Sequence, residues 1–516
     1  MEVLPRPVTH DDTGPQMWVD EAIWGHRLYD EQTPWLTMLE FFGVFHAEHA
    51  KGRALREDGM NTLSYQPQQQ LRLRNILFNN PHVDTVRAGD ESDEAMWARW
   101  LELMRNNAGG LDEPDFGYLR DRFESFQDFA AIISFLQSSA IEGGSNKRWS
   151  SKFVFPFGGN ALYEDASVQA KGSSVSNDRR FFARTGEILY LMLCRSRHAD
   201  RLKEALVERL FGVDSPYDGL VAALQGETQH ARNQRAGAFL PCSAHPVFDR
   251  MASDWLSILG LEMPVHDAIP HLVTMTGLHL LLYQLQRAAE VMGIDEPPQF
   301  VCEIVSPKRS VVRDISADSF QRNNALPQQA MERYILRIAE TPEWAAALAS
   351  EEPTTNALDL LAKEFDLADD VLEAEEGRRQ PADLLAMLLD RANTRHKQHV
   401  GKIHGAWARF IGLSSRRASR RIRYAPTDRL LKTLVVCCVE VRMEYKDFLK
   451  LLHDRYGILV GNHQAAQFID SGQADKEDFS ENARRLEDRL ASLGLLKRLS
   501  DSCAYVESPF RKKVVQ

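Results

Sequence analysis

The chain has 516 residues, of which 44% are hydrophobic and 26% charged, an ordinary composition for folded globular domains. This composition excludes a disordered chain, a collagen-like repeat and a small disulfide scaffold. Lysine plus arginine number 62 and aspartate plus glutamate 73, so the net charge of −11 gives no overall attraction to a polyanion.

The N-terminal residues 1–14 have no apolar segment behind a basic flank, and their acidic residues argue against a transit peptide. The longest apolar stretch, residues 271–285, contains two histidines and is shorter than the roughly 20 residues that a helix needs to cross a bilayer. Six scattered cysteines favour reduced thiols. We therefore expect a cytoplasmic protein without a membrane span.

Hydrophobic residues recur at three- and four-residue steps through much of the first 142 residues. The pattern predicts two helices within 16–60, interrupted at Thr33–Pro34, and further helices at 92–108 and 118–142. Aromatic side chains recur on one side of each helix and are candidates for the core. We expect residues 1–142 to form an α-helical N-terminal domain.

The segment 143–186 changes character, with paired glycines, serines and short aromatic runs that predict loops and short strands. The periodicity predicts helices again at 187–194, 199–211, 248–259 and 269–292. Residues 299–306 alternate like a short strand. We expect residues 143–310 to form a central domain of mixed loop, strand and helix.

Two blocks of opposite charge follow a predicted helix at 328–339. Residues 340–390 hold fourteen acidic and three basic residues, and residues 391–427 hold ten basic residues and no acidic one. The core of the basic block, SSRRASRRIRY (414–424), can follow a phosphate backbone, because each neutralised phosphate releases a counterion. Alternatively, the acidic block neutralises the basic block within the fold. We expect residues 311–423 to form a helical region that carries both blocks.

Residues 424–516 have a recognisable order of elements. Thr427 is placed to cap one helix, a second helix over 445–456 ends at Gly457, and a third with an apolar stripe ends at Gly494. Residues 495–507 then alternate around a turn, which predicts a hairpin. This order resembles a winged helix-turn-helix, although the third helix carries four basic and five acidic residues and suits protein contacts equally well. The predicted fold class is mainly α and multidomain, with short β elements and a winged-helix-like C-terminal domain.

Two segments are candidates for contact with nucleic acid, because arginines grip phosphates and aromatic rings stack on bases. In the glycine-rich segment 143–186 the aromatic residues alternate, so a buried strand explains that pattern as well. The candidate residues are Arg416, Arg417, Arg420, Arg421 and Arg423 in the basic block, and Lys147, Arg148, Lys152, Arg179 and Arg180 in the glycine-rich segment.

Signals for catalysis are weak. The chain has no P-loop, GxSxG, HExxH or paired CxxC motif. The sequence around His46 and Glu48, taken with residues 241–245, partly resembles the zinc deaminases, but a histidine replaces the second cysteine of their motif. Weak candidates for a metal site are Cys242, His245, His266 and His271. We expect no cofactor and favour a protein that is not an enzyme.

The strings IWGHRLYDEQTPW (23–35) and NKRWSSKFVFPFGG (146–159), together with the winged-helix-like tail, resemble large subunits encoded in bacterial antiphage defence operons. The resemblance implies a cytosolic, DNA-directed or complex-forming role beside a separate ATPase, helicase or nuclease. We therefore expect a non-catalytic, nucleic-acid-contacting subunit of a multi-protein bacterial DNA-processing or antiphage defence complex. The alternatives are a cryptic metal-dependent hydrolase or nuclease, and a pure protein–protein adaptor.

Overall fold

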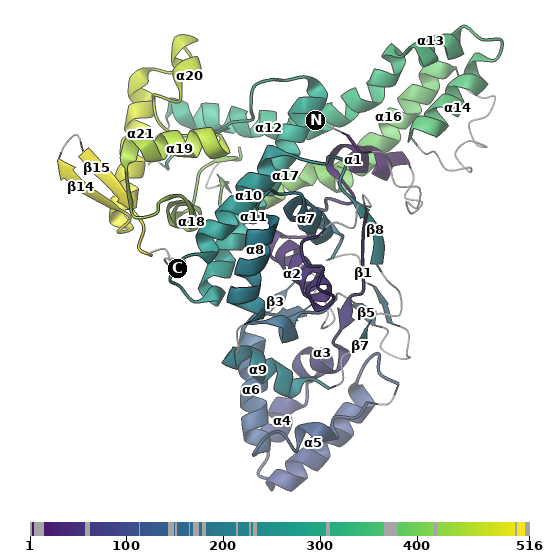
Figure 1. The fold of residues 1–516 in the computed structure, drawn as a ribbon, viewed down its shortest axis with the longest axis vertical. Coiled ribbons are helices and arrows are strands. Elements are labelled where there is room, and N and C mark those ends of the chain that lie inside the picture. The colour runs from purple at the N-terminus through teal and green to yellow at the C-terminus, as the bar shows by residue number, and fades with distance from the viewer. Residues whose placement is uncertain are drawn as a thin grey trace. The chain divides into compact units, whose positions relative to one another are not determined.

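Figure 1 shows the computed structural model, in which helices predominate and the strands are short, as the sequence predicts. Contacts divide the chain into two compact units, residues 31–239 and residues 1–30 together with 240–516. The finer division into four domains stays a prediction. The structure describes residues 3–4, 15–56, 62–112, 114–142, 149, 152–164, 166–168, 175–177, 182–212, 215–226, 229–230, 235–305, 310–365, 380–416, 421–500 and 503–510.

The unit formed by residues 31–239 consists of helices and small antiparallel strand pairs. Its helices and helical turns are α2 (Pro34–Ala50), α3 (Leu71–Phe78), α4 (Val83–Arg87), α5 (Asp93–Asn107), η1 (Gly117–Leu119), α6 (Phe126–Ser138), η3 (Gly159–Ala161), α7 (Thr185–Cys194), α8 (Ala199–Leu206), η4 (Val207–Phe211) and α9 (Pro216–Leu224). Its strands are β1 (Thr62–Tyr65), β2 (Gln68–Gln69), β3 (Ala140–Glu142), β4 (Lys152–Val154), β5 (Ala166–Val168), β6 (Val175–Asn177), β7 (Gln229–His230) and β8 (Arg235–Phe239). The pairs are β1 with β8, β2 with β7, β3 with β4, and β5 with β6.

Aromatic packing holds α5 against α6 in this unit. Trp97 and Trp100 are buried on α5, and the ring of Phe129 on α6 lies 5.0 Å from Trp97 and 4.8 Å from Trp100. Such edge-on and tilted ring contacts add to the stabilisation from area burial. The aromatic core predicted for these helices is therefore confirmed. The break predicted at Thr33–Pro34 is confirmed as well, since Thr33 caps α2 by accepting a hydrogen bond from the amide of Leu36.

The second unit consists of residues 1–30 and 240–516. Its helices are α1 (Pro15–Trp24), α10 (Pro246–Leu259), α11 (Val265–Met292), α12 (Val311–Leu336), η5 (Arg337–Glu340), α13 (Pro342–Leu348), α14 (Pro353–Phe365), α16 (Pro381–Gln398), α17 (Val400–Phe410), α18 (Asp428–Cys438), α19 (Tyr445–Tyr456), α20 (Ala466–Asp470) and α21 (Lys476–Ser492). Its strands are β9 (Phe300–Val301), β10 (Ser414–Ser415), β11 (Arg423–Tyr424), β12 (Arg442–Glu444), β13 (Ile458–Leu459), β14 (Leu496–Ser500) and β15 (Cys503–Glu507).

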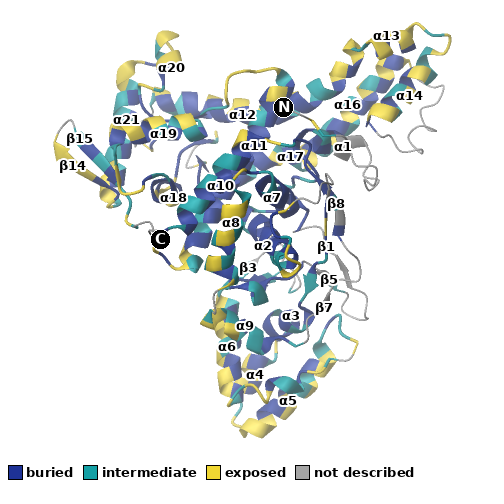
Figure 2. Ribbon diagram, in the orientation of Figure 1, coloured by how far each residue is buried: buried dark blue, intermediate teal, exposed yellow. Residues whose placement is uncertain are grey.

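Two long helices form the centre of this unit. Helix α11 is buried along most of its length, and α12 packs beside it (Figure 2). The helix predicted at 328–339 in fact begins at Val311, because Pro327 lies inside α12 and does not start it. Pro327 is buried, so packing offsets the lost backbone hydrogen bond. The strand predicted over 299–306 is limited to β9, which pairs in parallel with β13.

A buried polar network connects α10 and α11 to α18 and α19. The carboxylate of Asp254 accepts hydrogen bonds from Tyr456 Oη at 2.8 Å and from Arg455, and lies 2.7 Å from Nε2 of His279. Although burial alone would raise the pKa of Asp254, the His279 and Arg455 partners lower it, so the carboxyl is ionised. The network fixes the C-terminal helices on the centre of the unit.

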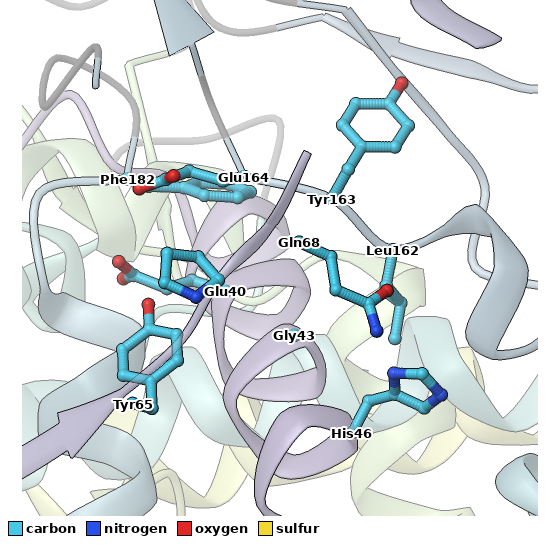
Figure 3. A pocket seen from close by; sticks show the side chains of 10 residues that line it. Glu40, Gly43, His46, Tyr65, Gln68, Leu162, Tyr163, Glu164 and Phe182 are labelled. Carbon is cyan, nitrogen blue, oxygen red and sulfur yellow. The ribbon is translucent and has the colours of Figure 1, made fainter. Parts of the chain in front are cut away.

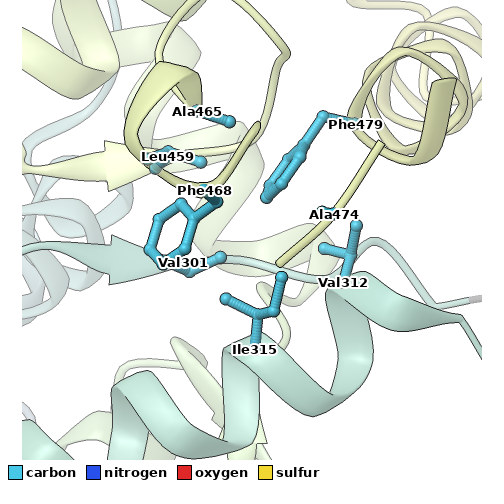
Figure 4. Packing of buried hydrophobic residues seen from close by; sticks show 8 residues of the cluster. All are labelled: Val301, Val312, Ile315, Leu459, Ala465, Phe468, Ala474 and Phe479. Atoms are coloured by element: carbon cyan, nitrogen blue, oxygen red, sulfur yellow. The ribbon is translucent and has the colours of Figure 1, made fainter. Parts of the chain in front are cut away.

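Apolar packing joins α20 and α21 to α12. Figure 4 shows Phe468 and Phe479 facing one another above Val301, Val312 and Ile315, and the two rings lie 6.1 Å apart. Burial of such side chains contributes about 2 kcal/mol each.

Among the described helices, none has the length and apolar character that a membrane span needs.

Candidate nucleic-acid interface

The described residues at the two ends of the arginine-rich core, 414–416 and 421–424, contain the paired stem of a β-hairpin. Strands β10 and β11 pair antiparallel, with Ser414 opposite Tyr424 and Ser415 opposite Arg423. Residues 414–424 are called the arginine hairpin below. Its stem continues toward α18, because the amide of Ala425 donates to the carbonyl of Leu413 and the amide of Thr427 to that of Gly412.

The base of the hairpin depends on a glycine. Gly412 ends α17 at a φ of +81°, a backbone conformation that only glycine adopts without strain. A Cβ atom at this position would also overlap Oγ1 of Thr427. The same hydroxyl caps α18 by accepting a hydrogen bond from the amide of Leu430. The turn therefore sets the spacing between α17, the hairpin and α18.

A buried ion pair anchors the stem of the hairpin to the interior of the unit. Arg423 is 1% exposed, and its guanidinium contacts the carboxylate of Glu303, which is fully buried. Arg313 lies 3.3 Å from the other carboxylate oxygen of Glu303. A charge buried in this way is stable only while it keeps its partner. Arg423 thus holds the stem in place, and its guanidinium points into the protein.

Tyr424 provides a second anchor. Its hydroxyl accepts a hydrogen bond from Asn323 at 2.9 Å and lies 2.7 Å from Nε2 of His404, and its carbonyl accepts from the hydroxyl of Ser316. Burial lowers the pKa of His404 to about 3, so the imidazole is neutral. Asn323 and Ser316 both lie on α12. The hairpin stem is therefore fixed to the helix at the centre of the unit.

The tip of the hairpin carries exposed positive charge. Arg416 is exposed, and Arg421 has 64% of its side chain exposed, with Nη1 3.8 Å from a carboxylate oxygen of Asp318. An exposed pair of this length contributes little to stability and is easily exchanged for another anion. Arg417 and Arg420 lie outside the described residues. The described arginines of the tip, Arg416 and Arg421, thus lie at the outer ends of the two paired strands.

Two further arginines that the sequence analysis did not single out lie at the base of the hairpin. Arg429 lies over the ring of Phe410 at 5.7 Å and donates to that residue's carbonyl. Arg489 of α21 donates to Asp428 at 2.6 Å and to the carbonyl of Pro426 at 3.1 Å. They join the ends of α17, α18 and α21. No sequence signal connects them, because their partners are distant in the chain.

Helix α21 offers a different kind of surface. Arg484 and Arg485 both pair with Glu481, at 2.8 and 3.3 Å. The acids Glu487 and Asp488 pair with Arg498 of β14, at 2.7 and 3.2 Å. The charged side chains of α21 named here are balanced by close partners, so the surface that they form has little net attraction for a polyanion.

The glycine-rich segment is only partly described. Lys147, Arg148, Arg179 and Arg180 lie outside the described residues, and Lys152 is half-buried in β4. Phe153, next to Lys152, lies in the interior, where its ring stacks on Phe182 at 4.8 Å, whereas Phe155 and Phe157 are half-buried. The rings of Phe153 and Phe182 therefore form core packing, as the buried-strand alternative predicts for these two residues.

The weak metal candidates are not brought together. Cys242 is buried beside the hydroxyl of Tyr283, His245 caps α10, His266 is partly exposed, and His271 has its Nδ1 2.8 Å from the hydroxyl of Thr433. Among the described residues, no group of three or more His, Cys, Asp or Glu side chains is placed to hold a metal ion.

The other unit contains a buried ionic cluster that the sequence analysis missed. The guanidinium of Arg235 lies 2.9 Å from Glu40, 2.6 Å from Glu164 and 3.3 Å from Glu187. Figure 3 shows Glu40 and Tyr65 pointing toward one another on one side of a small pocket, and His46 with Gln68 on the other. The pocket has a volume of about 20 Å³, which is room for about one water molecule.

This cluster changes the titration of Glu40. Burial, together with the neighbouring charge of Glu187, raises the pKa of Glu40 to about 7, although Arg235 opposes the shift. The four charged residues come from α2, β8, α7 and the loop after η3, so no local pattern reveals them. The pocket is too small for a substrate, and we interpret the cluster as an internal ionic connection.

Comparison with protein families finds a match over the C-terminal part of the chain. Residues 384–507 match the family described as Methylation-associated defense system protein MAD7. The resemblance to antiphage defence subunits that the sequence analysis inferred is therefore supported by this match. The matched residues cover most of α16, then α17, the arginine hairpin and the C-terminal elements up to β15. No curated protein and no solved structure is significantly similar to the chain.

Proposed function

We propose that this chain is a non-catalytic, nucleic-acid-contacting subunit of a multi-protein bacterial defence complex. The observation that carries the proposal is the arginine hairpin, which holds Arg416 and Arg421 in solvent on a stem fixed by buried Arg423 and Tyr424. The family match supports the defence role, since it includes this hairpin.

The construction of the hairpin favours a phosphate backbone as its ligand. A fixed stem reduces the conformational entropy that the tip loses on binding, which is the benefit of preorganisation. Arginine forms two parallel hydrogen bonds with a phosphate and stays charged at every physiological pH. Residues 391–427 contain no acidic side chain that would compete with a phosphate for these arginines from within the block.

The order of the C-terminal elements supports the winged-helix interpretation of residues 424–516. Helices α18, α19 and α21 precede the β14–β15 hairpin, and β15 lies between β12 and β14. Residues 457–475 insert β13 and α20 between the second and third helices. Because the arginines of α21 are paired with acids, we assign nucleic acid to the arginine hairpin and a partner subunit to α21.

A binding assay tests the nucleic-acid role. Fluorescence anisotropy with a labelled duplex DNA of about 20 base pairs compares the wild-type chain with a variant in which Arg416, Arg417, Arg420 and Arg421 are all changed to glutamate. At low salt we expect the variant to bind at least about tenfold more weakly, because four phosphate contacts become repulsions.

The matched control is Arg105→Glu with Arg201→Glu, two exposed arginines on α5 and α8 in the other unit. This control reverses charge away from the hairpin, and we expect its affinity to remain within about twofold of wild type. If the hairpin variant binds as the wild type does, or if the control loses as much affinity per charge, the hairpin is not the interface.

A further inference from the structure

A groove lies beside the arginine hairpin, in the same unit. It has a volume of about 680 Å³ and lies between α12, the segment that leads into β9, and α20. This volume falls within the range of about 300–1,000 Å³ that ligand sites occupy. Sites of this size take a small molecule or one part of a polymer.

The groove begins one helical turn from the hairpin tip. Arg421 lies near Asp318 on α12, and Arg322, the next residue on that face of the helix, lines the groove. Arg322 is exposed and has no charged or hydrogen-bonding partner among the described residues. Arg421 and Arg322 therefore lie on either side of Asp318, which leaves one net positive charge at this edge of the groove, while Glu296 also belongs to the lining. Asn323 connects the two directly, since it lines the groove and donates to the hydroxyl of Tyr424 in the hairpin stem.

Side-chain amides dominate the polar lining of the groove. Gln321 and Gln329 follow α12 at a spacing of eight residues and are exposed, with no hydrogen-bond partner among the described residues. On the opposite wall the amide of Gln467 donates to the side chain of Gln299 at 2.8 Å. Carboxamides offer a donor and an acceptor together and match the edges of nucleobases. Ile294, Pro297 and Leu326 supply apolar surface that can cover the faces of a base.

We propose that this groove receives an unpaired nucleotide of a nucleic acid whose backbone lies on the arginine hairpin. The inference rests on the proposed function and specifies its substrate class, a strand with unpaired bases. In a duplex the bases are stacked and only their edges are accessible, so a whole base enters the groove only when it is single-stranded or flipped out. The charge of Arg322 next to the amide lining favours this occupant over an apolar peptide.

The test compares three labelled DNA probes by anisotropy on the full chain: a single strand of about 20 nucleotides, the corresponding duplex, and that duplex with a single-stranded tail. The variant is Ala325→Trp, which fills the groove from an exposed position on α12. We expect it to weaken binding of the single strand and of the tailed duplex by about tenfold, the size of one lost base contact. Binding of the blunt duplex should change less than about twofold, and the salt dependence should stay as in wild type, because no charge is removed.

Two further variants complete the design. Ala325→Ser, which leaves the groove open, should bind as the wild type does, and Gln321→Glu with Gln329→Glu should weaken the single strand without filling the groove. Unchanged single-strand binding by Ala325→Trp and by the double glutamate variant overturns the groove assignment, and so does equal weakening of the blunt duplex. Failure of the proposed function gives a different result. In that case the wild-type chain binds none of the probes, or the chain with the four hairpin arginines changed to glutamate binds all of them as tightly as the wild type does.

Discussion

At the scale of single residues, arginines that are close in sequence have opposite roles. Arg421 and Arg423 are two positions apart, yet Arg421 is 64% exposed and Arg423 is 1% exposed. Strand alternation does not explain the difference, because residues two positions apart in a strand share a face. Arg421 precedes β11 and is exposed, whereas Arg423 lies in β11 and pairs with the buried Glu303. The buried arginine fixes the stem, and the exposed arginines are available to a ligand.

This division predicts a large loss of stability when the buried arginine is replaced and almost no change when the exposed arginines are replaced. Arg423→Met should lower the free energy of unfolding by about 3–5 kcal/mol, because it removes one of the two cations that neutralise buried Glu303. Arg416→Glu with Arg421→Glu should change it by less than about 0.5 kcal/mol, since both side chains are exposed. Urea denaturation checks both values. Equal effects of the two changes would contradict the assignment of Arg423 as the anchor.

Glu40 predicts a pH dependence for the unit of residues 31–239. Its pKa is about 7 in the fold and 4.5 in the unfolded chain, so the folded state binds the proton more tightly. The contribution to stability is complete below about pH 4.5 and is lost as the pH rises through about 7, by up to roughly 3 kcal/mol. Glu40→Gln should flatten this decline in urea denaturation between about pH 5 and 8.

The control for this prediction is Glu102→Gln, which removes an exposed carboxyl from α5 in the same unit. It should keep the wild-type decline of stability with pH. A Glu40→Gln chain that loses stability with rising pH as steeply as wild type would show that another group is responsible.

At the scale of elements, the turn between α17 and the hairpin is the point where one residue decides the geometry. Gly412→Ala introduces both a strained φ of +81° and an overlap with Thr427. Gly472→Ala introduces a similar φ of +71°, but no atom lies within 4 Å of the added Cβ. The pair of substitutions therefore separates backbone strain from steric overlap.

We expect Gly472→Ala to cost about 1 kcal/mol from backbone conformation alone. Gly412→Ala should cost a further 1–3 kcal/mol, roughly, from the overlap. Chemical denaturation of the two variants gives the difference. If the two substitutions cost the same, Thr427 moves aside freely and the turn does not constrain the hairpin.

Elements with local signals were predictable from the sequence, and elements decided by packing were not. Helix α19 has the predicted bounds because Gly457 ends it in the left-handed conformation, and Thr427 caps α18 as expected. Helix α12 was predicted too short, since its interior Pro327 is tolerated only in its buried setting. The partner of Arg423 could not be predicted, because Glu303 lies 120 residues away in the sequence.

At the scale of the whole molecule, the net charge of −11 conceals a local positive surface. Residues 391–427 contribute ten basic and no acidic residues, and the structure places two of them, Arg416 and Arg421, in exposed positions next to one anchored stem. The candidate site could be located from composition, because charge density is local in sequence. Its rigidity and the adjacent groove could not, because both depend on contacts with α12.

The measurement that tests this account most directly is the salt dependence of DNA binding by the wild-type chain and by the chain with Arg416→Ala and Arg421→Ala. Anisotropy titrations between about 50 and 200 mM salt give the slope of log affinity against log salt. We predict that the slope of the variant is shallower by about two, one for each phosphate contact removed. An unchanged slope with unchanged affinity would contradict the assignment of the arginine hairpin as the nucleic-acid interface.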